Sequence, residues 1–307
     1  MYDLIIIGSG PAGLSAAVYA KRAMLKAVVV EQLPLSGGQI INTTDVDNYL
    51  GLPGIGGFEL AQKFRSHADG LGVEFINASV LNVRDKGFHK EVSLGSGEVL
   101  SANALIIATG AKNRLLGASG EQELTGKGVS YCATCDGAFY KGKTAAVVGG
   151  GDVALEDAIY LSRICKKVYV IHRRDSFRGA KYLGDKLRGL ENVEILWDTV
   201  VESINGDDRV ESVNIRNLKN DESSRLELDG VFIAVGISPN SELVRNLVYC
   251  DDNGYIKADE GCKTSLPGIF AAGDVRTKPL RQVVTAVSDG AASVMSAERY
   301  LESIALA

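Results

Sequence analysis

The chain has 307 residues, of which 46% are hydrophobic and 23% charged, and its formal net charge is −5. This composition is typical of a globular enzyme, and the negative balance argues against nucleic acid as a partner. No uninterrupted run of about 18 apolar residues exists and no basic leader is visible, so we expect no membrane association. Five cysteines in a chain of this size argue against a secreted disulfide scaffold, so we expect a cytoplasmic protein.

A strand, a glycine-rich turn, a helix and a second strand open the chain. Residues 3–7 are an apolar run of strand type, turn 8–13 follows, a helical pattern extends to about residue 22, and the run 27–30 ends at Glu31. The glycines let a pyrophosphate approach the helix N-terminus, and Glu31 can accept hydrogen bonds from ribose hydroxyls. The pattern predicts a dinucleotide site, with a purely structural glycine turn as the alternative.

The next hundred residues continue this unit. Gly37-Gly38-Gln39 and Asn48 lie in a polar segment that resembles either a ligand-covering loop or simple turns. We predict an amphipathic helix over 58–68, a strand over 73–76 and an antiparallel meander over 78–100 with a turn at 95–97. The buried strand 105–110 ends in the small residues Thr109 and Gly110, as strands that approach a ligand do.

Two cysteines lie three residues apart near the middle of the chain. Cys132 and Cys135 can meet in one turn, Asp136 follows directly, and a helix start there would favour a thiolate. Half of a zinc site would need two more ligands at suitable spacing, which the other cysteines and the histidines do not offer. Two unrelated buried cysteines are the other alternative. The pattern favours a redox-active disulfide with its own proton donor and acceptor.

The opening pattern then recurs. Strand 145–148, turn 149–154, helix 155–164 and strand 168–171 repeat its order, and Glu31 corresponds to His172 in the second copy. His172-Arg173-Arg174 is followed by Arg178, and guanidinium groups bind a 2′-phosphate where a carboxylate would repel it. The second site is therefore predicted to bind NADPH rather than NADH. A solvated basic helix start is the alternative.

The rest of the second unit also repeats the first. We predict meander strands at 193–201, 209–217 and 225–229, and the buried strand 231–236 closes this unit as 105–110 closes the first. The duplication predicts an α/β fold of two Rossmann-like three-layer domains, the second inserted in the first, each with a small antiparallel meander. The predicted domains are 1–113 with 244–307, for the first dinucleotide, and 116–241, for NADPH and the disulfide.

The C-terminal segment contains one more strand and a long final helix. Strand 268–274 ends in Gly273-Asp274, and Arg281-Gln282-Val283 opens a long helix with apolar spacing through Leu301. An aspartate at the carboxyl end of a strand can bind sugar-like hydroxyls, and a helix N-terminus can face the edge of a flavin.

Several motifs together carry a family resemblance over essentially all of the chain. GSGPAG, GGQ with Asn48, ATG, SYCATCDG, GGGDVA, HRRDSFR, GISPN, FAAGD and RQVVTA occur in this order, and the sequence resembles the low-molecular-weight thioredoxin reductases. The resemblance implies FAD on the first unit, NADPH on the second, a thioredoxin-like partner and a homodimer. The implied FAD contacts are Gly8, Ser9, Gly10, Pro11, Ala12, Gly13, Glu31, Gly38, Gln39, Asn48, Thr109, Gly110, Gly273, Asp274, Arg281, Gln282 and Val283. The implied NADPH contacts are Gly149, Gly151, Asp152, Val153, Ala154, His172, Arg173, Arg174 and Arg178.

The resemblance also assigns roles around the disulfide. It implies that Cys135 faces the flavin, that Cys132 attacks the partner disulfide, and that Asp136 donates and accepts the proton. Two departures from the family pattern are Val153, where Ser or Thr is common, and Ala138 before Phe139, where two aromatic residues are common. Cys165, Cys250 and Cys262 match no catalytic position, and we predict that they are packing residues.

The order of the motifs predicts a domain movement. The disulfide and the NADPH site lie on one unit, yet both must react with a flavin on the other, and one face of a ring cannot easily host both. We expect residues about 115–241 to rotate against the remainder, around connections near 112–117 and 240–246. A ferredoxin-linked or peroxiredoxin-system reductase and a flavin redox sensor are the alternatives; the basic cluster argues against ferredoxin as the donor.

Overall fold

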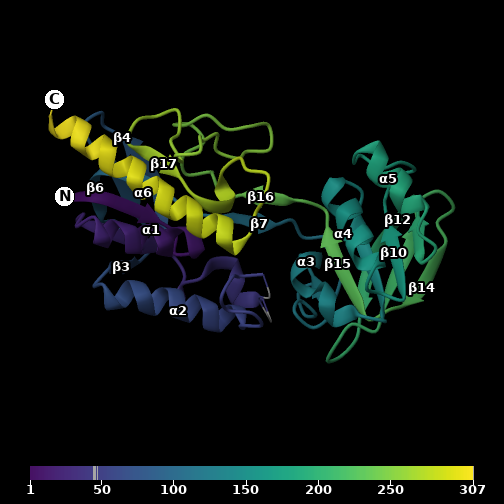
Figure 1. Ribbon diagram of the computed structural model, residues 1–307. Coiled ribbons are helices and arrows are strands. Elements are labelled where there is room, and N and C mark those ends of the chain that lie inside the picture. The colour runs from purple at the N-terminus through teal and green to yellow at the C-terminus, as the bar shows by residue number, and fades with distance from the viewer. Residues whose placement is uncertain (44–45, 47, 307) are drawn as a thin grey trace. The chain divides into compact units, whose positions relative to one another are not determined.

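The computed structural model describes residues 1–43, 46 and 48–306, and the chain forms two compact units (Figure 1). Unit 1 consists of Met1–Lys112 together with the segment that begins at Ser238, and unit 2 consists of Asn113–Ile237. Unit 2 is therefore an insertion in unit 1. None of the described helices is long and apolar enough to cross a lipid bilayer.

In the described part of the chain, unit 1 is built on a seven-stranded sheet with the order β3-β2-β1-β6-β5-β4 and with β17 beside β6. The parallel strands are β1 (Tyr2–Ile7), β2 (Ala27–Glu31), β3 (Glu74–Asn77), β6 (Val99–Ile107) and β17 (Ile269–Ala271). The hairpin of β4 (Val80–Asp85) and β5 (Lys90–Leu94) joins β6 in antiparallel pairing. The apolar runs of β1 and β2 suit strands that are buried on both faces.

Helices cover one face of this sheet. α1 (Pro11–Arg22) and α6 (Val283–Ala305) pack side by side and bury Leu4 and Ile6 (Figure 1). Their close approach requires Gly290, because a Cβ there would lie 2.2 Å from the carbonyl oxygen of Ala12. α2 (Gly57–Gly70) packs beside α1 and the short 3₁₀ helix η1 (Gly38–Asn42). Residues from β4, β5 and the 244–275 segment cover the opposite face.

Unit 2, which is described throughout, repeats this plan with a five-stranded parallel sheet of order β11-β10-β9-β15-β8. Its strands are β8 (Val129–Ser130), β9 (Thr144–Gly149), β10 (Lys167–Ile171), β11 (Val193–Leu196) and β15 (Gly230–Ala234). One face packs on the helices α3 (Ala133–Asp136), η2 (Gly137–Tyr140), α4 (Asp152–Ser162) and α5 (Lys181–Arg188). The other face packs on a separate antiparallel sheet of β12 (Thr199–Asn205), β13 (Ser212–Asn217) and β14 (Ser223–Glu227).

The predicted meander strand at 193–201 is wrong in one respect. Residues Val193–Leu196 form β11, which pairs in parallel with β10, and only Thr199 begins the meander. The turn at Trp197 and Asp198 separates the two strands, and Asp198 has a positive φ of 52° there. This left-handed residue redirects the chain from one sheet into the other.

The chain crosses twice between the units. The first crossing includes β7 (Ala111–Asn113) and the second includes β16 (Ile237–Pro239), and these strands pair as a two-stranded sheet. Asn240 is already anchored in unit 1, because its side-chain amide donates to the carbonyl of Thr109 at 2.9 Å and its own carbonyl accepts from the Thr109 hydroxyl at 2.6 Å. Val244 is fully buried in the unit 1 core. The second crossing therefore lies at β16.

Candidate active site

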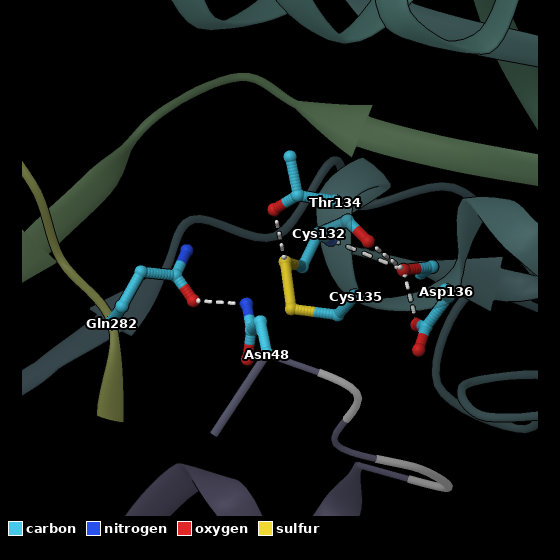
Figure 2. The surroundings of a disulfide bond; sticks show 7 residues. Asn48, Cys132, Thr134, Cys135, Asp136 and Gln282 are labelled. Carbon is cyan, nitrogen blue, oxygen red and sulfur yellow. Dashed lines mark hydrogen bonds between the residues drawn. A yellow bond between two sulfur atoms is a disulfide. The ribbon is translucent and has the colours of Figure 1, made fainter. Parts of the chain in front are cut away.

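A disulfide joins Cys132 and Cys135 in unit 2 (Figure 2). Cys132 occupies the N-cap position of α3 and Cys135 lies within this single turn, so the two Cα atoms are 5.3 Å apart. Both residues are half-buried. The sulfur of Cys132 lies 3.4 Å from the hydroxyl oxygen of Thr134, and either atom can be the donor. The structure thus forms the bond that the spacing predicted.

Asp136 is held beside this disulfide by Ser130. The Ser130 hydroxyl donates to Asp136 Oδ2 at 2.6 Å and accepts the backbone N–H of Cys132 at 3.1 Å. Ser130 is buried at the end of β8. One side chain therefore links the carboxylate to the backbone of the first cysteine. Ser130 was not identified from the sequence, because a serine at the end of a strand has no distinctive local pattern.

A buried carboxylate fixes the residue that precedes Cys132. Glu121 is 2% exposed and accepts three hydrogen bonds, from the backbone N–H groups of Leu116 and Gly117 at 2.9 and 2.7 Å and from the Tyr131 hydroxyl at 2.8 Å. Burial, with the hydrogen bond to Glu121 as a further cause, raises the pKa of Tyr131 to about 12. Tyr131 therefore keeps its proton and remains a donor. Neither residue was identified from the sequence.

The other three cysteines are free thiols. Cys165 and Cys262 are buried and Cys250 is half-buried. Burial raises the pKa of the Cys165 thiol to about 11 and that of the Cys262 thiol to about 12. Both therefore stay protonated near neutral pH, and unreactive thiols of this kind suit the packing roles that we predicted.

The first glycine turn, in unit 1, is closed on one side and open on the other. A Cβ at Gly8 would lie 2.5 Å from the carbonyl oxygen of Ala108, and one at Gly13 would lie 1.9 Å from that of Gly8. A Cβ at Gly10 would meet only the Cα of Gly38, at 4.0 Å. Gly10 is also the N-cap of α1, and no side chain caps this helix end. The turn therefore presents helix N–H groups that can bind an anion.

Two carboxylates lie at the carboxyl ends of strands in unit 1. Glu31 ends β2, and its Oε2 accepts the backbone N–H and the hydroxyl of Ser9, both at 2.8 Å. Asp274 follows β17 in the 3₁₀ helix η3 (Gly273–Val275), and burial raises its pKa. Among the described residues, Asp274 Oδ1 has no hydrogen-bond partner. A buried acceptor of this kind suits a ligand that donates a hydroxyl.

The start of α6 is joined to the segment around residue 48. The side-chain amide of Asn48 donates to Gln282 Oε1 at 3.0 Å (Figure 2), and Gln282 caps α6 together with Thr285. Arg281 lies 4.1 Å above the ring of Tyr255. Gln39 donates to the carbonyl of Ala111. Several residues that the resemblance implies for FAD are thus linked within unit 1: Gln39, Asn48, Thr109 and Gln282.

The second glycine turn, in unit 2, has the same construction. A Cβ at Gly149 would lie 2.4 Å from the carbonyl oxygen of Ala234, whereas a Cβ at Gly151 would meet nothing within 4 Å. Gly151 is the N-cap of α4, again without a side-chain cap. Asp152 Oδ1 accepts the backbone N–H of Ala180 at 2.7 Å and ties the following loop to this turn. Val153 is 62% exposed at the helix start.

The predicted basic cluster divides into two parts. Arg173, Arg174 and Arg178 are exposed, and the backbone N–H of Arg178 donates to the carbonyl of Gly150 at 2.8 Å. His172 is buried instead, because its ring lies against Gly150 and its Nε2 is 3.0 Å from the carbonyl oxygen of Ser176. Burial lowers the pKa of His172, so the ring is neutral near pH 7. His172 supports the turn from inside the fold, while the arginines face solvent.

The comparisons with known proteins agree with this architecture. Residues 2–290 match the profile of the pyridine nucleotide-disulphide oxidoreductase family. The chain is 46% identical to a thioredoxin reductase of Listeria monocytogenes and 44% identical to one of Bacillus subtilis, over 99% of this chain and 95% and 96% of theirs. The chain belongs to the thioredoxin reductases of this family. The solved thioredoxin reductase of Streptococcus pyogenes shares its fold, with a TM-score of 0.93 and 46% identity over 99% of both chains.

A ferredoxin-flavin thioredoxin reductase of Clostridium acetobutylicum is a more distant thioredoxin reductase relative. It has 32% identity and a TM-score of 0.54 over 98% of both chains. Family membership makes this chain an oxidoreductase of the pyridine nucleotide-disulphide type.

Proposed function

We propose that the chain is an NADPH-dependent flavoprotein that reduces oxidised thioredoxin, with electrons passing from NADPH to FAD, to the Cys132–Cys135 disulfide and then to the partner. The disulfide in its single turn is the observation that carries this proposal. Two glycine turns with open helix N-termini and the thioredoxin reductase relatives support it. A disulfide that is half-buried on one turn can be reached by small and protein thiols.

FAD is proposed to bind unit 1. Its pyrophosphate would lie at the open side of Gly10 and its ribose near Glu31. Another FAD hydroxyl would donate to Asp274 Oδ1, which has no hydrogen-bond partner among the described residues. When bound, FAD would accept a hydride from NADPH and pass two electrons on to the disulfide. Ser9 already bonds Glu31, so the carboxylate is oriented before the ligand arrives.

NADPH is proposed to bind unit 2. The open side of Gly151 leaves room for its pyrophosphate at the start of α4. The exposed Arg173, Arg174 and Arg178 are proposed to bind the 2′-phosphate, which NADH lacks. Because His172 is buried and neutral, we propose that it positions the turn and contributes no charge to the phosphate site.

The exchange with thioredoxin is proposed to use both sulfurs in turn. Once two electrons and two protons have opened the disulfide, the Cys132 thiolate attacks one sulfur of the thioredoxin disulfide and releases the other as a thiolate. Cys135 then attacks Cys132 in the mixed disulfide, which restores the Cys132–Cys135 bond and frees dithiol thioredoxin. Asp136, held by Ser130, is proposed to accept and return the proton that these thiols exchange.

A rotation between the units is proposed to separate the two half-reactions. The turn proposed for NADPH and the disulfide both lie in unit 2, while the residues proposed for FAD lie in unit 1. Hydride transfer and disulfide reduction each need access to the same flavin ring. Unit 2 must therefore alternate between two orientations relative to unit 1 during turnover. A chemical crosslink between the units should permit one half-reaction and stop multiple turnover. Normal turnover in the crosslinked protein would contradict the rotation.

The electron path is tested by anaerobic mixing of the purified flavoprotein with NADPH and then with oxidised thioredoxin. We expect NADPH to bleach the visible flavin band and thioredoxin to restore it. In the Cys135→Ser variant, NADPH should still bleach the flavin band, but oxidised thioredoxin should no longer restore it. Bleaching by reduced ferredoxin and not by NADPH would instead favour the ferredoxin-linked class, and a single turnover with thioredoxin would favour a redox sensor.

Assembly and location are proposed from the family resemblance. We propose a homodimer in the cytoplasm, with thioredoxin or a thioredoxin-like protein as the partner. Light scattering of the holoenzyme should give twice the mass of one chain. Fractionation of the source cells should recover the protein with the cytoplasmic markers.

A further inference from the structure

Three hydrogen bonds converge on Asp289, in the second turn of α6. Its carboxylate accepts the backbone N–H of Gly273 at 3.0 Å, the Arg276 guanidinium at 2.9 Å and the Lys278 ammonium at 2.7 Å. The site is closed to solvent, since 11% of the Asp289 side chain and 6% of the Lys278 side chain are exposed. Two cations and one backbone donor thus share a single buried carboxylate.

The three donors flank Asp274 along the chain. Gly273 precedes it directly, and Arg276 and Lys278 follow it. Arg276 has further acceptors, because it also donates to the carbonyl oxygens of Ala258 and Asp259 at 3.4 and 2.9 Å. For the Lys278 ammonium, Asp289 is the one partner among the described residues. Asp289 therefore decides where the Lys278 charge is held.

Asp274 is a second buried carboxylate on which the Lys278 charge acts. Lys278 and Arg281 both favour the ionised form of Asp274 electrostatically, although burial is the larger influence and raises its pKa. Its Oδ1 is nevertheless without a hydrogen-bond donor in the part of the chain that the structure describes. If Asp289 did not hold Lys278, the ammonium would be drawn to this oxygen, since a buried cation needs a partner.

We propose that Asp289 is a positioning residue for FAD, which holds Lys278 away from Asp274 and so keeps the Asp274 carboxylate free to accept a flavin hydroxyl. The inference rests on the proposed function, in which unit 1 binds FAD. It assigns to α6 a part in the flavin site that goes beyond its N-terminal residues.

The test measures the affinity of flavin-free protein for FAD by the quenching of FAD fluorescence. Asp289→Asn keeps the shape but loses the charge, so Lys278 moves to Asp274 and we expect the Kd for FAD to rise by about tenfold or more. Lys278→Met should bind FAD within about threefold of the wild type. In Asp289→Asn combined with Lys278→Met the competing ammonium is gone, and we expect most of the lost affinity to return.

Asp251→Asn is the matched control. Asp251 also lies in unit 1 and accepts two backbone N–H groups, from Asn253 and Tyr255, but its carboxylate has no bond to Lys278 or Asp289. It should bind FAD as the wild type does. Thermal unfolding of each flavin-free variant reports folding separately from binding. If Asp289→Asn does not fold, the inference is tested by comparing the Kd for FAD of the charge-balanced double variant with that of Lys278→Met.

Either of two results would overturn the inference. Asp289→Asn with unchanged affinity would show that Asp289 does not act on the flavin. A double variant that binds FAD about tenfold or more weakly than Lys278→Met would show that Asp289 acts on FAD only by holding the loop of Gly273 and Arg276 in place, and not through Lys278. Failure of the proposed function looks different, because the wild type itself would then not bind FAD or would not be reduced by NADPH.

Discussion

Ser130 donates a hydrogen bond of 2.6 Å to Asp136 while it accepts the backbone N–H of Cys132. The acid beside the disulfide is therefore not an independent surface group, since a buried serine orients it toward the segment that carries the first cysteine. Hydrogen bonds to a carboxylate are charge-assisted and stronger than neutral ones. The position of the Asp136 carboxylate therefore depends on this hydroxyl.

Ser130→Ala should slow disulfide exchange. The loss of one hydrogen bond to a charged group corresponds to about 1.5–3 kcal/mol, so we expect the reoxidation of NADPH-reduced enzyme by thioredoxin to slow by about tenfold or more. Flavin reduction by NADPH should be unchanged, and the pH profile of reoxidation should shift. Ser162→Ala is the control, because within the described part of the chain that hydroxyl donates only to the carbonyl of Ile159 on α4. Equal pH profiles in Ser130→Ala and the wild type would refute the role.

Gly10→Ala and Gly151→Ala should each weaken one cofactor and spare the other. Both positions have negative φ, and an added Cβ meets no protein atom closer than 4.0 Å, so the fold should be kept. The methyl group would occupy the space into which a pyrophosphate is proposed to fit. We expect Gly10→Ala to raise the Kd for FAD and Gly151→Ala to raise the KM for NADPH, each by about tenfold. Equal weakening of both cofactors by either variant would contradict the assignment.

Arg173→Ala combined with Arg174→Ala should change the preference between nicotinamide cofactors. Both guanidinium groups are exposed at the end of β10. If they bind the 2′-phosphate, their removal should raise the KM for NADPH by about 10- to 100-fold, which corresponds to about 1.4–2.8 kcal/mol, and leave the KM for NADH unchanged. Arg188→Ala, at an exposed arginine paired with Asp185, is the control. A parallel rise for NADH would indicate a general structural defect.

Asp157 should make the stability of the protein depend on pH. Burial, with a smaller effect of Glu156, raises the pKa of Asp157 to about 7. The folded state then holds this proton more tightly than the unfolded state, in which the pKa is about 3.9. The unfolded state loses its proton first, so the contribution of this group to folding stability falls as pH rises from about 4 to about 7 and stays low above that.

Asp157→Asn removes this titration. Relative to the wild type, the variant should gain about 2–3 kcal/mol of unfolding free energy between pH 5 and pH 8. Denaturant titrations of both proteins at the two pH values measure the difference. Asp185→Asn, at an exposed aspartate of α5, should show no such trend. A gain that is the same at both pH values would show that Asp157 is not protonated in the folded protein near pH 5.

Local sequence patterns anticipated most of the fold. The apolar runs and glycine turns indicated the strands β1, β2, β9 and β10 and the helices between them, because these units form from contacts close in the chain. The pairing of Cys132 with Cys135 was predictable for the same reason, since a separation of three residues closes within one turn. The strand β11 was misplaced, because apolar alternation does not show which sheet a strand will join.

The sequence by itself determined the two nucleotide-binding folds and the redox pair, because each is encoded by residues that are neighbours in the chain, and the order of the motifs indicated that one unit is inserted in the other. Only the tertiary structure decided which polar groups tune these sites. It brings Glu121 to Tyr131, buries His172 beneath its turn and places Asp289 beside Lys278. Contacts of this kind depend on the packing of separate elements, and a buried charge leaves no periodic pattern in the sequence.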